Sequence, residues 1–167
     1  SDASNKLGTQ MKATGEVMSI GRTMEESLLK AMRSLETGVC HIYHKKFDDW
    51  TNDRLLEYIA EPTDDRLYAI AQLIRGGVDL VLIYNRTKID MFFLEKFKNI
   101  VEFERVVEAA PMNIEVLREA KRMGFSDKFI GQLWGVSQHD MYLLREKNGI
   151  FPVYKMIDTC ASEFASY

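Results

Sequence analysis

The chain is poor in the features that mark secreted and membrane-spanning proteins. It has two cysteines in 167 residues, Cys40 and Cys160, and they lie far apart in the sequence. It has no run of about 18 apolar residues, the length that a membrane-spanning helix needs, and its N-terminus lacks the apolar core of a signal peptide. We therefore expect a cytoplasmic protein with no membrane partner, whose cysteines are thiols rather than a disulfide.

The chain also has few prolines, no low-complexity sequence and no excess of positive charge. The chain has three prolines and no low-complexity run, so we expect little disorder away from its ends. Its formal net charge of -3 argues against a nucleic-acid partner. Hydrophobic residues make up 46% and charged residues 28% of the chain, which is a typical globular balance. The length fits one domain, or one domain with flanking pieces.

The sequence motifs of common catalytic sites are missing too. There is no GxGxxG or Walker-type phosphate loop, no Ser/His/Asp set and no obvious pair of catalytic carboxylates. Cys40, His41 and His44 are metal-ligand types at short spacing, but a structural zinc site needs four ligands. The nearby Asp48 and Asp49 do not complete a zinc spacing. We therefore assign no catalytic, cofactor-binding or metal-binding residue to this chain.

The most informative pattern present is a long amphipathic stretch, residues 87–110. Apolar residues recur there at spacings of three and four, which predicts a helix about 35 Å long around which other helices pack. Thr87 and Asp90 form a capping pair at its start, and Pro111 follows its end. The apolar stripe contains Ile89, Phe93, Phe97, Ile100, Phe103 and Val107, widened by Phe92, Leu94, Val101 and Val106. The opposite stripe contains Glu95, Lys98, Glu102 and Arg105.

Shorter helices are predicted on both sides of this stretch. A capping box at Thr23 opens one helix, Thr51 caps a second, and residues 63–66 open a third. Residues 78–84 form an apolar run that fits a buried strand or a buried helix, and the lack of a neighbouring strand favours the helix. After Pro111, three helices each begin at a capping side chain and end at a glycine. These pairs are Asn113 with Gly124, Ser126 with Gly135, and Ser137 with Gly149.

The predicted fold is therefore all-α, an irregular bundle of short helices around one long helix. A short non-helical segment precedes it, because residues 17–20 between two glycines read as a strand that has no partner strand in this chain. Residues 39–50 show no clean period and read as a loop with buried aromatic residues.

Residues 129–147 also have the outline of a helix-turn-helix, with Gly135 in the turn and Ser137 capping the second helix. DNA reading would require the second helix to present Gln138, His139, Arg145 and Lys147. The positive charge is sparse, so a free-standing DNA-binding regulator is the alternative rather than the preferred function.

Two long segments resemble a known enzyme family. Residues 9–23, TQMKATGEVMSIGRT, are similar to the end of the first ATP-grasp module in the large subunit of carbamoyl phosphate synthetase. Residues 152–164, PVYKMIDTCASEF, are similar to the segment that begins the second half of that subunit. Between them, residues 65–67, 87–90, 93–94 and 124–127 resemble the family's helical oligomerisation, or connection, domain in the same order.

This resemblance implies three parts: residues 1–36 as the tail of the first synthetase module, 37–150 as the oligomerisation domain, and 151–167 as a linker. The parent enzyme would make carbamoyl phosphate from bicarbonate, glutamine-derived ammonia and ATP, with Mg²⁺ or Mn²⁺, for arginine and pyrimidine biosynthesis. Its partners would be the flanking ATP-grasp modules, a small glutaminase subunit and further copies of itself. The fragment alone would bind no cofactor and be inactive.

The resemblance transfers few residues, because the family's ATP and metal ligands lie outside this stretch. Met11 and Glu16 match positions near the family's carbamate tunnel. Glu16 would either polarise that passage or serve as a structural partner of a nearby arginine. Cys160 lies in a family motif, but no neighbouring base or charge activates it as a nucleophile.

Overall fold

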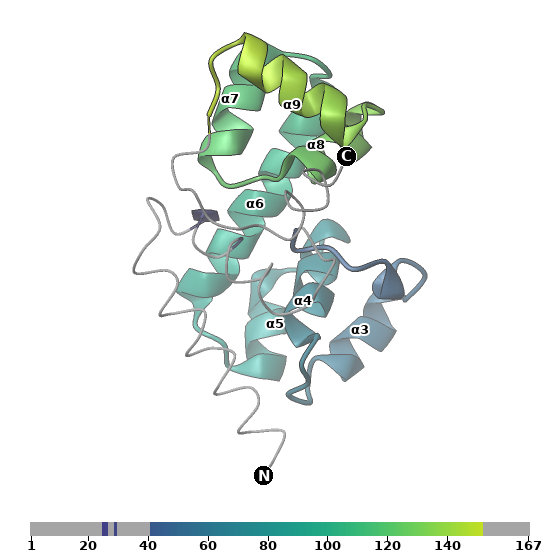
Figure 1. The fold of residues 1–167 in the computed structure, drawn as a ribbon. Helices are drawn as coiled ribbons and strands as arrows, with labels where there is room; N and C mark the ends of the chain where they lie inside the picture. The colour runs from purple at the N-terminus through teal and green to yellow at the C-terminus, as the bar shows by residue number, and fades with distance from the viewer. Residues whose placement is uncertain (1–24, 27–28, 30–40, 152–167) are drawn as a thin grey trace.

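The computed structural model describes residues 25, 26, 29 and 41–151, and the regular structure in this part is entirely helical (Figure 1). The predicted all-α class is therefore confirmed. The elements that follow residue 41 are η1 (Lys45–Phe47), α3 (Asn52–Tyr58), α4 (Arg66–Arg75), α5 (Leu80–Thr87), α6 (Met91–Ala109), α7 (Ile114–Arg122), α8 (Asp127–Trp134) and α9 (Gln138–Lys147). The predicted N-terminal strand and the start of the first helix lie outside the described residues.

Helix α6 is the longest element described and connects two groups of shorter helices. It packs against α4, α5, α7 and α8. Figure 1 shows α7–α9 gathered at one end of α6 and α3–α5 at the other. The predicted arrangement around one long helix is confirmed.

The start of α6 differs from the prediction. Thr87 is the last residue of α5, where its hydroxyl donates to the Ile83 carbonyl and accepts from the Ile89 amide. Lys88 then takes a left-handed backbone conformation with φ 57°, which ends α5. Asp90 alone caps α6, accepting from the Phe92 amide. The predicted capping pair was therefore half right, because the Thr87 side chain serves the preceding helix.

The buried face of α6 follows the predicted stripe with two exceptions. Phe97, Ile100 and Val107 are buried as expected. Phe92 and Val106 are 50% and 46% exposed, so their assignment to the apolar face was wrong. The reason is angular: they project from the side of α6 that carries the charged stripe, where no described helix covers them.

Helix α4 is buried around almost its whole circumference. Eight of its ten residues are buried, including Arg66, whose Nε donates to the Ile59 carbonyl at 2.7 Å. Its main neighbours are α3 and η1 on one side and α6 on the other. The small residues Ala69 and Ala71 let the helix fit between these neighbours.

Helix α5 is a helix, as predicted, but it is not buried. Ile83 is its one buried residue, whereas Val81, Leu82 and Tyr84 are 53%, 50% and 37% exposed. Its main described neighbour is α6. The prediction of a buried helix was wrong because an apolar run does not report how many sides of a helix are covered.

The last three helices follow the predicted pattern of caps. Asn113, Ser126 and Ser137 each accept a hydrogen bond from the backbone amide three residues later. Gly135 ends α8 in the left-handed conformation with φ 69°. These local signals fixed the helix boundaries because each cap satisfies a backbone group that the helix leaves without a partner.

The segment before α3 is a loop with one turn of 3-10 helix and buried residues, close to the prediction. Ile42 and Phe47 are fully buried, and Phe47 packs edge to face against Trp50 and Tyr58. His44 accepts a hydrogen bond from the Lys46 amide and caps η1. Over the described part of the chain, no helix has the length and apolar character needed to cross a bilayer.

Candidate association surface

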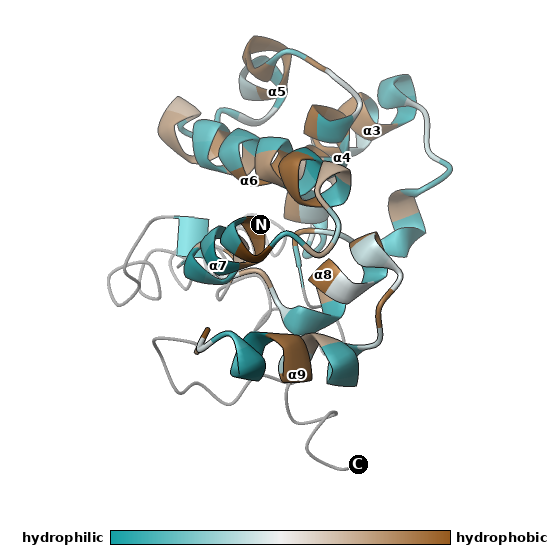
Figure 2. Cartoon of the chain, turned by 90° about the horizontal axis from the view of Figure 1, so that it is seen from above, coloured by the Kyte–Doolittle hydropathy of each residue, from teal (hydrophilic) through white to brown (hydrophobic). Residues whose placement is uncertain are grey.

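Exposed apolar side chains gather on α5 and on the first turn of α6. The group consists of Val81, Leu82, Tyr84 and Phe92, which we call the α5–α6 apolar face. Figure 2 shows α5 at the edge of the molecule with hydrophobic residues along it. Exposed apolar side chains on neighbouring helices are typical of surfaces that associate with other proteins.

A groove of about 540 Å³ adjoins this face, between the start of α5 and α6. Its apolar wall includes Val78, Leu80 and Met91, and its charged rim includes Lys98 and Glu102. A groove lined by apolar and charged side chains suits a protein segment better than a small ion.

The rim of the groove belongs to the charged stripe of α6. Glu95, Lys98, Glu102 and Arg105 are exposed, and their charges alternate along the helix. Arg105 donates to the Arg75 carbonyl at 3.1 Å. The other three form no hydrogen bond or ion pair with any residue that the structure describes, so their charges face solvent.

A buried ion cluster fixes the helices behind this surface. Arg75 on α4 donates twice to the Glu104 carboxylate on α6, from Nε at 2.8 Å and from Nη2 at 2.7 Å. His41 Nε2 lies 2.9 Å from the same carboxylate. Burial raises the pKa of Glu104, but the hydrogen bonds and charges of Arg75 and His41 outweigh burial and lower that pKa to about 2.

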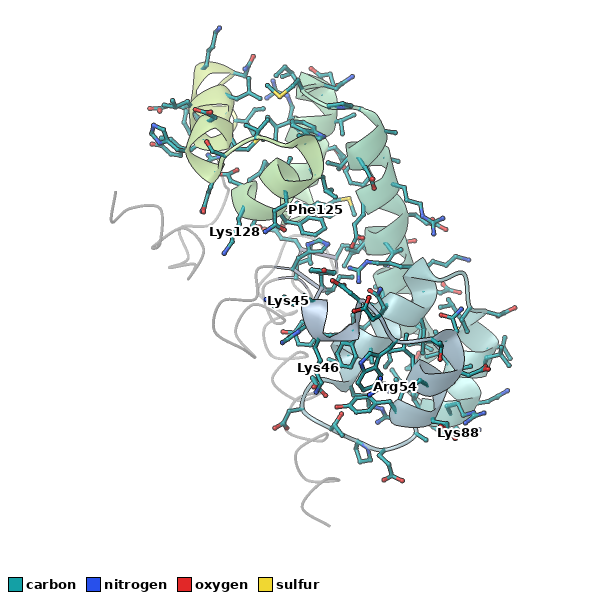
Figure 3. The ribbon with its side chains drawn as sticks, turned by 90° about the vertical axis from the view of Figure 1, so that its right-hand side faces the viewer. Lys45, Lys46, Arg54, Lys88, Phe125 and Lys128 are labelled. Atoms are coloured by element: carbon teal, nitrogen blue, oxygen red, sulfur yellow. The ribbon has the colours of Figure 1, made fainter. Side chains whose placement is uncertain are left out.

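His41 also connects this cluster to the second helix group. Its ring stacks on Phe129 of α8 at 3.7 Å and meets the edge of Phe125 at 4.8 Å. Figure 3 shows Phe125 between the two helix groups. The Trp134 indole donates a hydrogen bond to the Val107 carbonyl at 2.6 Å, which is a further contact between α8 and α6. The ion cluster and these contacts hold α4, α6 and α8 in one relative position.

The residues considered as metal ligands have separate structural contacts. His41 contacts Glu104 and Phe129, whereas His44 caps η1 and packs against Phe47 and Tyr68. Cys40 lies outside the described residues. No set of three or more His, Cys, Asp or Glu side chains in the described part is placed to hold a metal ion.

Helices α8 and α9 do form the predicted helix pair, but its key arginine is turned inward. Arg145 is 6% exposed, and its guanidinium binds both Asp127 oxygens and the Ile150 carbonyl. Burial raises the pKa of Asp127, but the positive charges of Lys121 and Arg145 outweigh it and lower that pKa. Arg145 is therefore a structural residue rather than a DNA-reading one.

Two cations on the surface of the described part of the chain have partners within the protein. Lys45, Lys46 and Arg54 lie on one side of the molecule (Figure 3). Lys46 pairs with Asp65, and the Arg54 guanidinium stacks on Trp50 at 3.7 Å. Two of the three cations are thus already engaged within the protein.

Met11 and Glu16, which the sequence places near a carbamate tunnel, lie outside the described residues, as does Cys160. Glu104 is a buried charged residue that sequence reasoning missed, as are Arg66 and Arg145. Its position four residues after Ile100 and three before Val107 puts it on the apolar face of α6, and a charge on that face is a signal for a buried partner.

Comparison with protein families gives a match over most of the chain. The family model described as carbamoyl-phosphate synthetase large chain, oligomerisation domain, matches residues 16–149. The match includes every helix from α3 to α9 and the α5–α6 apolar face. The chain belongs to the family of the carbamoyl-phosphate synthetase large-chain oligomerisation domain.

Proposed function

We propose that this chain connects two ATP-using halves of a synthetase large subunit and associates with a second copy of itself. The observation that carries the second role is the α5–α6 apolar face, where Val81, Leu82, Tyr84 and Phe92 are exposed. Burial of such a face on association is favourable in proportion to the apolar area removed from water.

The connecting role is supported by the residues on either side of the helical bundle. Residues 9–23 resemble the end of a first ATP-grasp module, and residues 152–164 resemble the start of the following half. A rigid bundle between them would set their spacing, and the Arg75–Glu104–His41 cluster gives the bundle that rigidity. We keep the division into residues 1–36, 37–150 and 151–167 for these parts.

The chemistry belongs to the proposed parent enzyme, an ATP-dependent ligase of the cytoplasm. It would form carbamoyl phosphate from bicarbonate, ammonia released by a glutaminase subunit, and ATP with Mg²⁺ or Mn²⁺, supplying arginine and pyrimidine biosynthesis. Met11 and Glu16 would lie beside the carbamate passage. The isolated chain would make no carbamoyl phosphate, because the residues that hold ATP and metal would come from the flanking modules.

Sedimentation velocity over a wide concentration range tests the association. We expect a reversible dimer that becomes more populated as concentration rises. A single species at the 19.3 kDa chain mass at every concentration would reject self-association by this chain. Calorimetric titration with Mg-ATP tests whether the ATP-binding residues lie in the flanking modules. Binding of Mg-ATP to this chain in the micromolar range would contradict that assignment.

A further inference from the structure

The order of charges on the exposed side of α6 is complementary to itself when read backwards. Glu95, Lys98, Glu102 and Arg105 follow one another at spacings of three, four and three residues. This spacing places all four in one ridge along the helix. Glu95 and Arg105 are equally distant from position 100, and so are Lys98 and Glu102, so each acidic residue has a basic counterpart at the mirrored position.

We propose that α6 of a second copy of this chain lies antiparallel on this ridge, related by a two-fold axis that passes through the ridge midway between Lys98 and Glu102. This inference rests on the proposed self-association and names the surface that carries it. Glu95 then faces the partner's Arg105, and Lys98 faces the partner's Glu102. Because a two-fold contact is self-complementary, each pair occurs twice and the interface contains four pairs of opposite charge.

Apolar side chains flank the ridge at matching positions. Phe92, Asn99 and Val106 are exposed and seven residues apart, so they form a second row beside the charges. Phe92 and Val106 are equally distant from Asn99 in the sequence. Position 99 is one residue away from position 100, the centre of the charged row. An antiparallel partner therefore brings Phe92 close to the partner's Val106, and Asn99 close to the partner's Asn99. The two large exposed apolar residues of α6 would thus cover each other, which accounts for their exposure in the single chain.

The groove on the other side of the ridge provides the second wall of the binding site for the partner's α6. Lys98, Glu102 and Arg105 form its rim, and Val81 of the α5–α6 apolar face lines its wall. Val81 therefore belongs both to the groove and to the apolar face on which the proposed function rests. A partner's helix that follows the ridge would contact α5 as well as α6.

Other arrangements of two α6 helices place like charges together. A parallel pair in register would set Glu95 against the partner's Glu95, and Lys98 against the partner's Lys98. An antiparallel pair shifted by about one turn would set Glu95 against the partner's Glu102, or Lys98 against the partner's Arg105. Contacts between like charges disfavour those registers, so the charges specify both direction and register.

Charge reversal in the full chain tests this pairing. Lys98→Glu places two like-charge contacts in the dimer, and so does Glu102→Lys. Each of these variants should raise the Kd of the dimer by about tenfold or more. The double variant restores opposite charges and should return the Kd to within about threefold of the original. An equimolar mixture of the two single variants should also dimerise, because the glutamate introduced at position 98 of one chain then faces the lysine introduced at position 102 of the other.

Matched controls lie on α9, where Lys147→Glu and Glu146→Lys make the same chemical changes at exposed positions. These controls should leave the Kd unchanged, and far-UV circular dichroism should show the same helicity for all variants. Single α6 variants that dimerise like the original chain would overturn the register but not the proposed association. Failure of the double variant and of the mixture to recover would overturn the pairing as well. An original chain that is monomeric at all concentrations would reject both.

Discussion

Arg75 and Glu104, 29 residues apart in sequence, form a bidentate ion pair that joins α4 to α6. The same guanidinium donates from Nη2 to the Ile42 carbonyl at 2.8 Å, so it also holds the segment that enters the bundle. Glu104 is 7% exposed and His41 is 2% exposed. One carboxylate therefore fixes three segments of the chain, and loss of its charge should loosen all three.

The first prediction concerns acid stability. The pKa of Glu104 falls from 4.5 to about 2 on folding, so its ionised form favours the folded state. This contribution is complete above about pH 4.5 and is lost as the pH falls toward 2. We expect Glu104→Gln to lose about 3 kcal/mol of unfolding free energy at pH 7. Urea unfolding at a series of pH values should show the variant and the original chain converging near pH 2, and a constant difference would contradict this origin.

The second prediction concerns the core of α6. Phe97 is 1% exposed at the centre of the buried stripe, so Phe97→Ala should cost about 3–5 kcal/mol through lost burial and the cavity left behind. Glu108→Ala changes an exposed residue of the same helix and should cost under about 0.5 kcal/mol. Urea melts of both variants compare them, and equal losses would mean that α6 is rotated about its axis.

The third prediction concerns the turn between α5 and α6. Lys88 adopts φ 57°, a conformation that is unfavourable for a residue with a β-carbon. Lys88→Gly keeps the backbone bond to the Tyr84 carbonyl and should stabilise the chain by about 0.5 kcal/mol or more.

The reverse change provides its control. Gly135 has φ 69°, and an added β-carbon there would meet no atom within 4 Å. Gly135→Ala should therefore cost about 1 kcal/mol from backbone conformation alone. Thermal melts that shift in the same direction for both variants would contradict the argument.

The fourth prediction concerns the contact that ties α9 to α8. Arg145 uses three nitrogens, two toward Asp127 and one toward the Ile150 carbonyl. Lysine has a single nitrogen, so Arg145→Lys should cost about 2 kcal/mol. Arg122→Lys is the control, because Arg122 pairs with Glu119 at an exposed site, and it should cost under about 0.5 kcal/mol. Chemical unfolding measures the loss of unfolding free energy in both variants. Equal losses would mean that Arg145 stabilises the chain no more than an exposed arginine does.

Local chemistry in the sequence was enough to predict where most of the helices begin and end. Thr51, Asn113, Ser126 and Ser137 cap their helices as predicted, because a capping side chain acts on amides only a few residues away. The all-α class followed from the spacing of apolar residues, which is also a local property. The family resemblance came from contiguous sequence and was confirmed over residues 16–149.

Tertiary structure decided which of these helices are covered and where charges are buried. The apolar run in α5 is exposed and α4 is enclosed, because burial depends on neighbours that are distant in sequence. Arg145 turned inward to Asp127, 18 residues away, which no helical period within α9 reveals. Glu104 became the centre of the bundle because folding brought Arg75 and His41 to it, and only that encounter makes a buried carboxylate stable.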